Sequence, residues 1–576
     1  MNLLLSPRSR ARVIAVALTL LGSARANASQ QQTQQQPISP GTVSGHVFRS
    51  DSGAPLPKAT VTLSISGQNN PNSQILPQIV RTDSSGAFQF TQVTPGKYTA
   101  RAEHNGFVPA GYGQNVEKQL PPTSFNVGPG QNLNKIDITL GAAGIISGTI
   151  TDGDNDPAEG IQVSAIALRY ARGGARQELQ MRTVTTDDQG NYRLFGLVPG
   201  FYFVRVFSPL AIGANLNTGT SFAPTYYPGT TQVEGAQRIQ VAPGAETSGI
   251  RFSLNSQLTH RITGNVNDGA GGSESRRFIT QLSRISPDGS NTGMTVQMGN
   301  VSNSDGSFAF NAVTSGDYVI VARSVDIAQQ SGPSSGVATG PPELRIGFTR
   351  VRMGDTDLQV NVTVFGPSEV KGKITVAGGQ GPPPAGVRFS LQSQIGAQGL
   401  VGGGQVAALD ANGNFDLRGV SQGEYNFNVA ISNQSTLYLK QATCASKDYT
   451  FQPLTIESPM TLSDCVITLG ADAGSISGQV TESSGPVPGL VVVAIPETRA
   501  LRSVARYVTS ARTDDNGQFT LAGVIPGDYL VYAVQFNDEQ SYFAPDFADT
   551  NVNDGERVTV HASENKTVNP KPPAVH

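Results

Sequence analysis

The 576-residue chain has no tryptophan, two cysteines, five histidines and only 14% charged residues. Its net formal charge is −3 and it has no block of lysine or arginine, so it lacks the electrostatic signature of a nucleic-acid-binding protein. The histidines are His46, His104, His260, His561 and His576. No HExxH grouping occurs, and the one H-x-x-E spacing, His561 to Glu564, is an isolated pair that does not supply the full ligand set of a zinc hydrolase. The G-x-S-x-G pattern occurs at 332–336, in a polar loop, and at 419–423, in a predicted hairpin turn, so neither match is the strand-to-helix elbow of a hydrolase. No P-loop or dinucleotide motif occurs, and we expect no enzyme activity and no cofactor.

Lysine is absent from residues 144–366, which excludes a Lys–Asn isopeptide crosslink there. Long apolar runs are absent after the N-terminus, so we predict no integral membrane segment in the mature chain. The N-terminus itself has the features of an export signal, with basic residues before an apolar run at 13–21 and an A-x-A site at 24–26 or 26–28. We therefore predict a signal peptide at 1–28, a disordered Gln-rich lead at 29–40, and an exported protein that is periplasmic, outer-surface or secreted.

Glycine (65 residues) and proline (36 residues) are abundant, and they recur within one stretch that the chain contains five times. The fifth copy, TDDNGQFTLAGVIPGDY, occupies residues 513–529, and the other copies begin at residues 82, 186, 302 and 409. Their first residues lie 104 to 116 positions apart, which is the size of a domain. The chain is therefore predicted to be a string of domains.

Each copy predicts a β-hairpin. The D-x-x-G turn favours a left-handed glycine, and the following run alternates large apolar residues, such as Phe519 and Leu521, with polar ones. A second turn keeps its glycine even where its proline is lost, so we expect positive φ at this glycine. These structural turn glycines are Gly96, Gly200, Gly316, Gly423 and Gly527. The tyrosine that opens the returning strand is interpreted as a core ring with its hydroxyl bonded to nearby backbone, the alternative being a ligand contact.

The remaining strands complete a β-sandwich in each repeat. Each repeat opens with a strand of the form Ile-Ser-Gly-Thr-Ile, whose glycine suggests a bulge or a close backbone approach. Each repeat ends with a closing strand, placed at 557–560 in the last one, and residues 267–300 of the third repeat lack a clean second strand. The predicted sandwiches are 41–141, 144–255, 258–366 (divergent), 368–470 and 474–568, followed by a tail at 569–576. Their joints are only a few residues long, so limited freedom between sandwiches is expected.

The opening strand, the P-x-x-x-A/G-x-V strand and the T-D-x-x-G-x-F…P-G-x-Y hairpin resemble the bacterial carboxypeptidase regulatory-like domain. This resemblance covers nearly all of the mature chain and is weakest in the third repeat. It implies an all-β chain of five tandem transthyretin-like or Ig-like β-sandwich domains, related in fold to starch-binding-like domains. It also implies an accessory module of exported proteins without catalysis. Because the joints are short, we expect the five domains to form an elongated array.

Two aromatic loops follow the hairpins of the second and fifth repeats and are candidate binding loops. Their aromatic residues are Phe222, Tyr226, Tyr227, Tyr542, Phe543 and Phe547. The rings can stack on sugars or on a protein, or they can pack back over the sandwich edge, and the lack of tryptophan lowers the sugar interpretation. The aspartates of the D-x-x-G turns raise calcium as an alternative, but each turn offers only one or two carboxylates.

The two cysteines, Cys444 and Cys465, fall in the fourth repeat. In an exported chain such a pair predicts a disulfide, which would tether the loop before the closing strand to that strand. A pair of unlinked core residues is the alternative. The predicted function is a non-enzymatic scaffold, adhesive or spacer protein of a bacterial cell envelope, with an envelope protein or glycan as partner. The alternative is a carbohydrate-binding protein that uses the aromatic loops.

Overall fold

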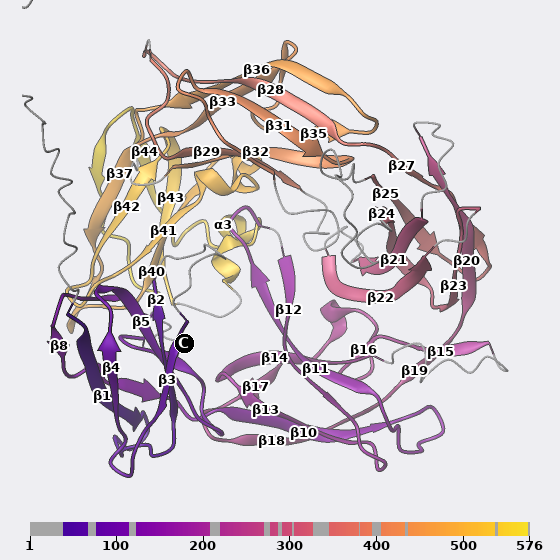
Figure 1. Ribbon diagram of the computed structural model, residues 1–576, viewed down its shortest axis with the longest axis horizontal. Coiled ribbons are helices and arrows are strands. Elements are labelled where there is room, and N and C mark those ends of the chain that lie inside the picture. The colour runs from indigo at the N-terminus through magenta and orange to yellow at the C-terminus, as the bar shows by residue number, and fades with distance from the viewer. Residues whose placement is uncertain are drawn as a thin grey trace, which may run out of the picture.

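The computed structural model of the chain is all-β, with many small sheets that form consecutive β-sandwiches (Figure 1). It describes residues 39–66, 76–114, 122–174, 176–207, 219–269, 277–285, 291–301, 305–325, 345–379, 381–393, 405–431, 436–535 and 540–573. The predicted signal peptide and nearly all of the predicted lead lie outside these residues. The predicted fold class of tandem β-sandwiches is confirmed. We call the five predicted sandwiches units one to five. In each, the opening sheet contains the first strand, and the tyrosine sheet contains the strand that bears the repeated tyrosine.

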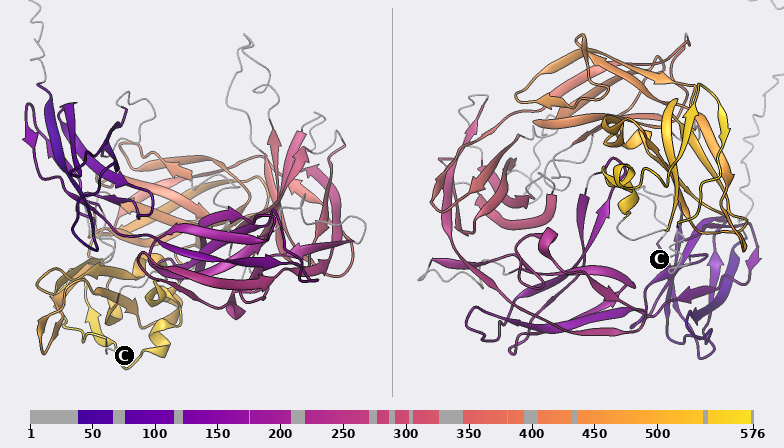
Figure 2. Two further views of the ribbon diagram at one scale, coloured as in Figure 1. Left: turned by 90° about the horizontal axis from the view of Figure 1, so that it is seen from below. Right: turned by 180° about the vertical axis from the view of Figure 1, so that it is seen from behind.

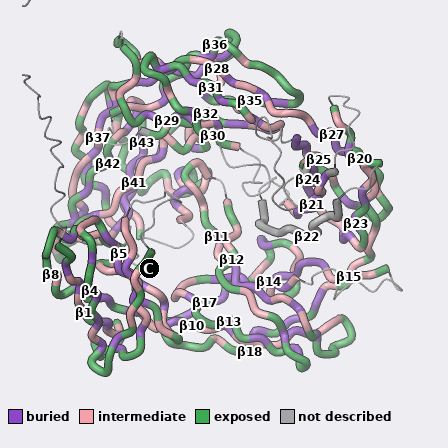
Figure 3. The backbone as a smooth tube through the Cα atoms, in the orientation of Figure 1, coloured by how far each residue is buried: buried purple, intermediate pink, exposed green. Residues whose placement is uncertain are grey.

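In unit one the opening sheet has the order β4-β1-β8 with β9 also paired to β1, and the tyrosine sheet has the order β3-β2-β5-β6 with β7 also paired to β5. Buried and exposed residues alternate along β4, as expected for a strand with one face in a core (Figure 3). The strands are β1 (Gly41–Arg49), β2 (Thr60–Ile65), β3 (Gln78–Arg81), β4 (Ala87–Val93), β5 (Gly96–Glu103), β6 (Ala110–Gly111), β7 (Phe125–Val127), β8 (Asn132–Leu133) and β9 (Ile138–Leu140).

Unit two has the opening sheet β13-β10-β18 and the tyrosine sheet β12-β11-β14-β16, with β17 also paired to β14. A further two-stranded sheet joins β15 to β19, which leads into unit three. The elements are β10 (Gly144–Thr151), β11 (Gln162–Tyr170), β12 (Arg176–Thr185), β13 (Asn191–Leu197), β14 (Gly200–Phe207), β15 (Thr220–Ala223), β16 (Thr225–Tyr226), η1 (Val233–Gly235), β17 (Ile239–Val241), β18 (Glu246–Ser253) and β19 (Asn255–Leu258).

Unit three contains strands where the sequence showed no clear pattern. Its sheets are β23-β20-β26, with β27 also paired to β20, and β22-β21-β24-β25. The expectation that 267–300 lacks a clean second strand is wrong, because β21 and β22 pair there. Buried Thr280 and Ser283 replace apolar residues in β21 and so obscure the alternation. The strands are β20 (His260–Asp268), β21 (Arg277–Ile285), β22 (Asn291–Val301), β23 (Ser307–Val313), β24 (Gly316–Val325), β25 (Ile346–Met353), β26 (Leu358–Gln359) and β27 (Val362–Val364).

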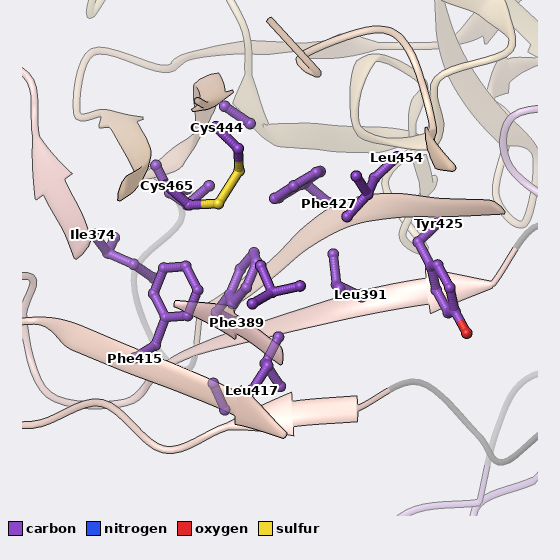
Figure 4. Close-up of a cluster of buried hydrophobic side chains, with 14 of the residues drawn as sticks. Ile374, Phe389, Leu391, Phe415, Leu417, Tyr425, Phe427, Cys444, Leu454 and Cys465 are labelled. Atoms are coloured by element: carbon purple, nitrogen blue, oxygen red, sulfur yellow. A yellow bond between two sulfur atoms is a disulfide. The ribbon is translucent and has the colours of Figure 1, made fainter. Parts of the chain in front are cut away.

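Unit four has a five-stranded opening sheet, β31-β28-β36-β33-β34, and the tyrosine sheet β30-β29-β32-β35. Its core contains both cysteines together with three phenylalanines, Phe389, Phe415 and Phe427 (Figure 4). The strands are β28 (Ser368–Val376), β29 (Val387–Ser393), β30 (Gln405–Ala407), β31 (Asn414–Val420), β32 (Gly423–Ile431), β33 (Tyr438–Cys444), β34 (Lys447–Asp448), β35 (Leu454–Ile456) and β36 (Thr461–Gly470).

Unit five has the opening sheet β42-β37-β45, the tyrosine sheet β41-β40-β43-β44 and a small sheet of β38 and β39. Residues 557–560 are not the closing strand next to β37: they lie in β44, and the short polar strand β45 takes that place. No helix in the described part of the chain is long and apolar enough to cross a lipid bilayer. The elements are β37 (Gly474–Gln479), β38 (Thr481–Glu482), β39 (Gly485–Pro486), β40 (Val491–Pro496), α2 (Arg499–Arg502), η3 (Ala505–Tyr507), β41 (Thr509–Arg512), β42 (Gln518–Val524), β43 (Gly527–Val534), η4 (Ser541–Phe543), α3 (Phe547–Thr550), β44 (Glu556–Val560) and β45 (Asn565–Thr567).

The glycine of every opening strand lies against the closing segment of its own unit. A Cβ atom at any of these glycines would overlap a main-chain carbonyl oxygen, so the close approach expected from the sequence is present in all five units. The opening strand and the closing strand are parallel neighbours throughout. The glycine and carbonyl pairs are Gly45 and Ile136, Gly148 and Ile250, Gly264 and Val360, Gly372 and Cys465, and Gly478 and Val568.

The five units follow one another around a closed turn and do not extend in a line (Figure 1). The tyrosine sheets face the centre of the turn and the opening sheets face outward, while units one and five are offset from each other along its axis (Figure 2). Contacts between unit two and unit five accompany this curvature. The expected elongated array is therefore corrected, because the short joints turn the chain consistently in one direction.

Candidate functional site

The tyrosine sheets of units two and five are buried on both faces, which sets them apart from those of units one and four. One face forms the core of the sandwich, and we call the other the reverse face. In unit one the reverse face carries polar residues such as Thr62 and Arg101, and in unit four it carries Arg388 and Asn428. In unit five all six residues of β40 and five consecutive residues of β43 are buried. Strands with two buried faces need a second covering layer.

In unit five the covering layer consists of four short helical segments. Two of them, α2 and η3, precede the hairpin of β42 and β43, and the other two, η4 and α3, follow it. The aromatic pair Tyr542 and Phe543, with 3% and 9% of their surfaces exposed, packs on Val491, Val493 and Leu530. Their ring centroids are 4.7 Å apart, and Phe547 contacts Tyr532 edge-on. The predicted loop of unit five is therefore a lid on its own sheet.

Arg502 fixes this covering layer to the sheet. Its guanidinium is buried and donates from Nη1 to Asp549 Oδ1 at 2.6 Å, from Nε to the Pro496 carbonyl at 3.0 Å, and from Nη2 to the Glu497 carbonyl at 3.0 Å. The hydrogen bond from Arg502 lowers the pKa of the Asp549 carboxyl. One cation thus joins α2, α3 and the end of β40.

In unit two the reverse face carries a buried polar network within an apolar cluster. Arg205 donates to Glu178 Oε2 at 2.9 Å, and the Tyr226 hydroxyl donates to the same oxygen at 2.8 Å. The guanidinium and the carboxylate are 3% and 5% exposed, and burial raises the pKa of Tyr226 far above its usual value. Ile166, Leu168, Phe203 and Val233 complete the cluster. Because the hydroxyl and both charges have partners, this network fixes β16 on the sheet.

The six candidate aromatic residues therefore pack on their own units. Tyr226 and the three aromatic residues of unit five lie on the reverse faces, whereas Phe222 and Tyr227 pack against the sandwich core of unit two. Tyr226, Tyr542 and Phe543 are buried, and Phe222, Tyr227 and Phe547 are half-buried. Buried ring faces are not available for stacking on a sugar, so the structure favours the packing alternative for the first three. The sequence signal for this arrangement was present in unit five, because Val-Val-Val-Ala-Ile-Pro is continuously apolar and not alternating.

The turn glycines begin the tyrosine strands β5, β14, β24, β32 and β43. Two residues later the tyrosine hydroxyl donates to a carbonyl four residues before it, for example Tyr529 to Ile525 at 2.7 Å and Tyr202 to Val198 at 2.6 Å. The same bond recurs in the other three units. The φ angles are 149° at Gly316, 156° at Gly423 and 158° at Gly527, whereas Gly96 lies outside this positive range. Positive φ is thus not a uniform requirement of this turn.

The D-x-x-G turns have the conformation expected of hairpin turns. Their glycines have φ between 71° and 80°, and the aspartate accepts main-chain N–H groups at the far side of the turn. Asp410 Oδ1, for example, accepts from Asn412 N at 2.9 Å and from Asn414 N at 2.7 Å. These bonds account for the aspartates without a bound cation. Within the described residues, no three His, Cys, Asp or Glu side chains lie close enough to hold one metal ion.

Cys444 and Cys465 form a disulfide between the neighbouring strands β33 and β36 (Figure 4). Their Cα atoms are 4.0 Å apart and both side chains are buried in the core of unit four. Cys444 was predicted to lie in the loop before the closing strand, but it is the last residue of strand β33. The disulfide therefore links two neighbouring strands of one sheet.

A buried threonine at the start of the repeated stretch was missed by the sequence analysis. Thr513 accepts from Leu490 N at 3.0 Å and donates to the Val487 carbonyl at 2.9 Å, which fixes the strand before the hairpin. Thr82 and Thr186 make the same two bonds in units one and two. The other two copies have Ser302 and Leu409 at this position. The available sequence signal was therefore that threonine begins three of the five copies and is replaced in the remaining two.

Solved structures that are similar to this chain include two pilins and one further bacterial protein. The minor pilin GBS52 of Streptococcus agalactiae is 11% identical over 37% of this chain and 95% of its own, with a TM-score of 0.20. The major pilin subunit BcpA of Bacillus cereus is 11% identical over 56% and 99%, with a TM-score of 0.14. The Bacillus anthracis TIE protein is 11% identical over 74% and 75%, with a TM-score of 0.15. No curated protein sequence matches the chain.

The family model of the carboxypeptidase regulatory-like domain matches three stretches, residues 42–141, 145–254 and 475–571. These stretches are units one, two and five, the units with the buried threonine, and together they make up more than half of the chain. Units three and four share the hairpin, the glycine contact and the tyrosine hydrogen bond. The chain therefore belongs to the carboxypeptidase regulatory-like domain family.

Proposed function

We propose that this chain is an exported, non-enzymatic scaffold of a bacterial cell envelope that holds its domains in a fixed arrangement. The observation that carries the proposal is the hydrogen bonding of the joints between units. At the joint of units one and two, Val108 N donates to the Gly141 carbonyl at 2.8 Å and Ala143 N donates to the Gly106 carbonyl at 3.0 Å. A joint fixed by main-chain bonds keeps the angle between neighbouring domains.

Two of the other joints are also hydrogen-bonded, in part through side chains. Between units four and five, Tyr438 Oη donates to Asp472 Oδ1 at 2.9 Å, and Arg506 Nη2 donates to the Thr450 carbonyl at 2.7 Å. Between units two and three, β19 pairs with β15, and Ser315 Oγ donates to Gln257 Oε1 at 3.4 Å. This stiffness supports a structural role in which the partner, an envelope protein or a glycan, is bound at positions set by the scaffold.

Export is supported by the disulfide of unit four, because structural disulfides form in oxidising compartments. The test is to express the full chain, including residues 1–28, in a bacterial host and to separate cytoplasm, periplasm, membrane and medium. We expect processed protein outside the cytoplasm with no titratable thiol, and binding of the purified protein to an envelope fraction or to members of a glycan panel. Unprocessed cytoplasmic protein with two free thiols, or purified protein that binds no envelope fraction and no glycan, would refute the proposal.

A further inference from the structure

The hairpin of β11 and β12 in unit two projects beyond the sheet to which it belongs. Its two strands pair with each other from Gln162 to Tyr170, whereas β14 pairs with β11 only as far as Ile166. Among the residues that the structure describes, no strand neighbours the outer part of the hairpin on the β14 side. Together with its turn residues 171–174, this part extends toward the centre of the turn of units, where α3 of unit five lies beside it (Figures 1 and 2). We call residues 167–174 and 176–179 the latch.

The latch contacts unit five through apolar and polar groups. Tyr170 packs against the reverse-face cluster that contains Tyr542 and Phe543. Arg172 donates from Nη2 to Ser510 Oγ at 3.1 Å, and its guanidinium lies 6.0 Å from the centroid of the Phe543 ring. The lid of unit five thus offers an aromatic face, and strand β41 offers a hydroxyl, to one aromatic and one cationic residue of the latch.

The two glycines of the latch fit this contact closely. Gly173 has a φ of 89°, and a Cβ atom there would lie 2.9 Å from the Ser503 carbonyl oxygen and 3.1 Å from Ala505 N. Gly174 has a φ of 81°, and a Cβ atom there would lie 2.5 Å from Pro545 Cγ. These neighbours belong to unit five, more than 300 residues away in the sequence. Both the backbone conformation and the space favour glycine at the point of contact.

We propose that the latch of unit two docks on the lid of unit five and holds the five units in a closed turn. The segment that packs on the lid is thus the β11–β12 hairpin of the same chain. Among the described residues, the latch contact includes the packing of Tyr170, the close fit of Gly173 and Gly174, and the hydrogen bond and cation–π contact of Arg172. Opening would expose the lid of unit five and free the latch. The closed turn is therefore a conformational state held by a docking contact as well as by the joints.

The test compares the wild-type full chain with a Gly173→Gln/Gly174→Gln variant by small-angle scattering at several dilutions. A matched control is Gly196→Gln/Gly249→Gln, since both control glycines lie in unit two and have φ of 76° and 79°, and a Cβ atom at either one would meet nothing within 4 Å. We expect the latch variant to have a larger maximum dimension, toward the roughly 150 Å of five sandwiches in line. The control is expected to keep the wild-type dimension.

Two further measurements keep the outcome decisive. Near-ultraviolet circular dichroism establishes that each variant is folded, and Arg172→Ala, which imposes no backbone strain, should give a smaller increase in the same direction. Hydrogen exchange at residues 541–550 should rise severalfold in both latch variants and stay unchanged in the control. Unchanged dimensions and exchange in a folded latch variant would refute docking. A wild-type dimer that dissociates in the latch variant would assign the lid to a second copy and refute the intramolecular latch.

Discussion

At the scale of single residues, each unit depends on a few positions where side-chain size or a single hydrogen bond is constrained. The glycine of the opening strand makes room for a carbonyl oxygen of the closing segment, and the tyrosine hydroxyl satisfies a carbonyl of the preceding turn. Buried backbone groups must be paired, so the tyrosine bond ties the turn to the core. These positions explain why the five units are recognisable as repeats although most of their other residues vary.

Gly148→Ala should destabilise unit two, because the new methyl group would overlap the Ile250 carbonyl oxygen between two paired strands. Overpacking of this kind costs about 1–3 kcal/mol. The measurement is hydrogen exchange at the amides of β10 and β18 in the full chain. Gly153→Ala is the control, because a Cβ atom at Gly153 meets nothing within 4 Å. Equal protection of β10 in the two variants would contradict the predicted overlap.

Acid should weaken the hairpin turns. The hydrogen bond from Asn414 lowers the pKa of Asp410, and the hydrogen bond from Ser85 lowers that of Asp83, below their usual value of 3.8. A lowered folded-state pKa gives stability that is complete above the usual pKa and is lost as the pH falls through the folded value. After correction for intrinsic rates, hydrogen exchange of β31 should therefore be constant from neutral pH to about pH 4 and accelerate as the pH falls below the usual pKa of 3.8. Asp410→Asn should reduce this acid effect in unit four, and an acid effect as large as in the wild type would exclude Asp410 as its source.

At the scale of elements, the predicted strands are those in which large apolar and polar residues alternate. Phe88 and Phe90, or Phe519 and Leu521, are buried as the period-two pattern predicts. Strands were not predicted where apolar and polar residues do not alternate. In β21 buried hydroxyl groups take apolar positions, and β45 is a short polar strand recognised only by its pairing with β37. The aromatic loops were recognised in the sequence, but binding and packing over the sandwich edge stayed open as alternatives, because a sequence does not show which surface a loop returns to.

Loss of the disulfide should destabilise unit four alone. It closes a loop with a sequence separation of 21 residues, for which the chain-entropy contribution is about 3 kcal/mol. We expect a Cys444→Ser/Cys465→Ser double variant to lower one thermal transition of the full chain by calorimetry and to leave the others in place. Treatment of the wild type with a reductant should reproduce that shift. A uniform decrease of all transitions would indicate that the units unfold together.

Unit five should fold by itself. Its core is contained within its own strands, and Gln479 N donates to Asn569 Oδ1 at 2.9 Å, so the isolated domain should include residues 474–573 and extend beyond the predicted end at 568. We expect a β-rich spectrum and a cooperative thermal transition. Residues 474–555, which lack β44 and β45, serve as the comparison and should not fold. A broad transition of the longer fragment would place the domain boundary elsewhere.

At the scale of the whole molecule, the direction in which the tyrosine sheets face distinguishes this chain from a simple row of domains. All of them face the centre of the turn (Figure 1), so the loops and edge strands of different units come close to one another. Such proximity allows a segment of unit two to reach unit five. Repetition of one domain with similar joints therefore produces a curved arrangement, and the curvature creates contacts that none of the units has alone.

The parallel pairing of the first and last strands has a mechanical consequence. The chain enters each unit at one end of the opening strand and leaves at the opposite end of the closing strand, as β10 and β18 show. A pulling force along the chain therefore loads the hydrogen bonds between these two strands in shear, so that they must break together and not one after another. In unit four the closing strand is also covalently linked to β33 by the disulfide. The arrangement that makes each unit compact is thus also the one that best resists extension when the protein is held at its two ends.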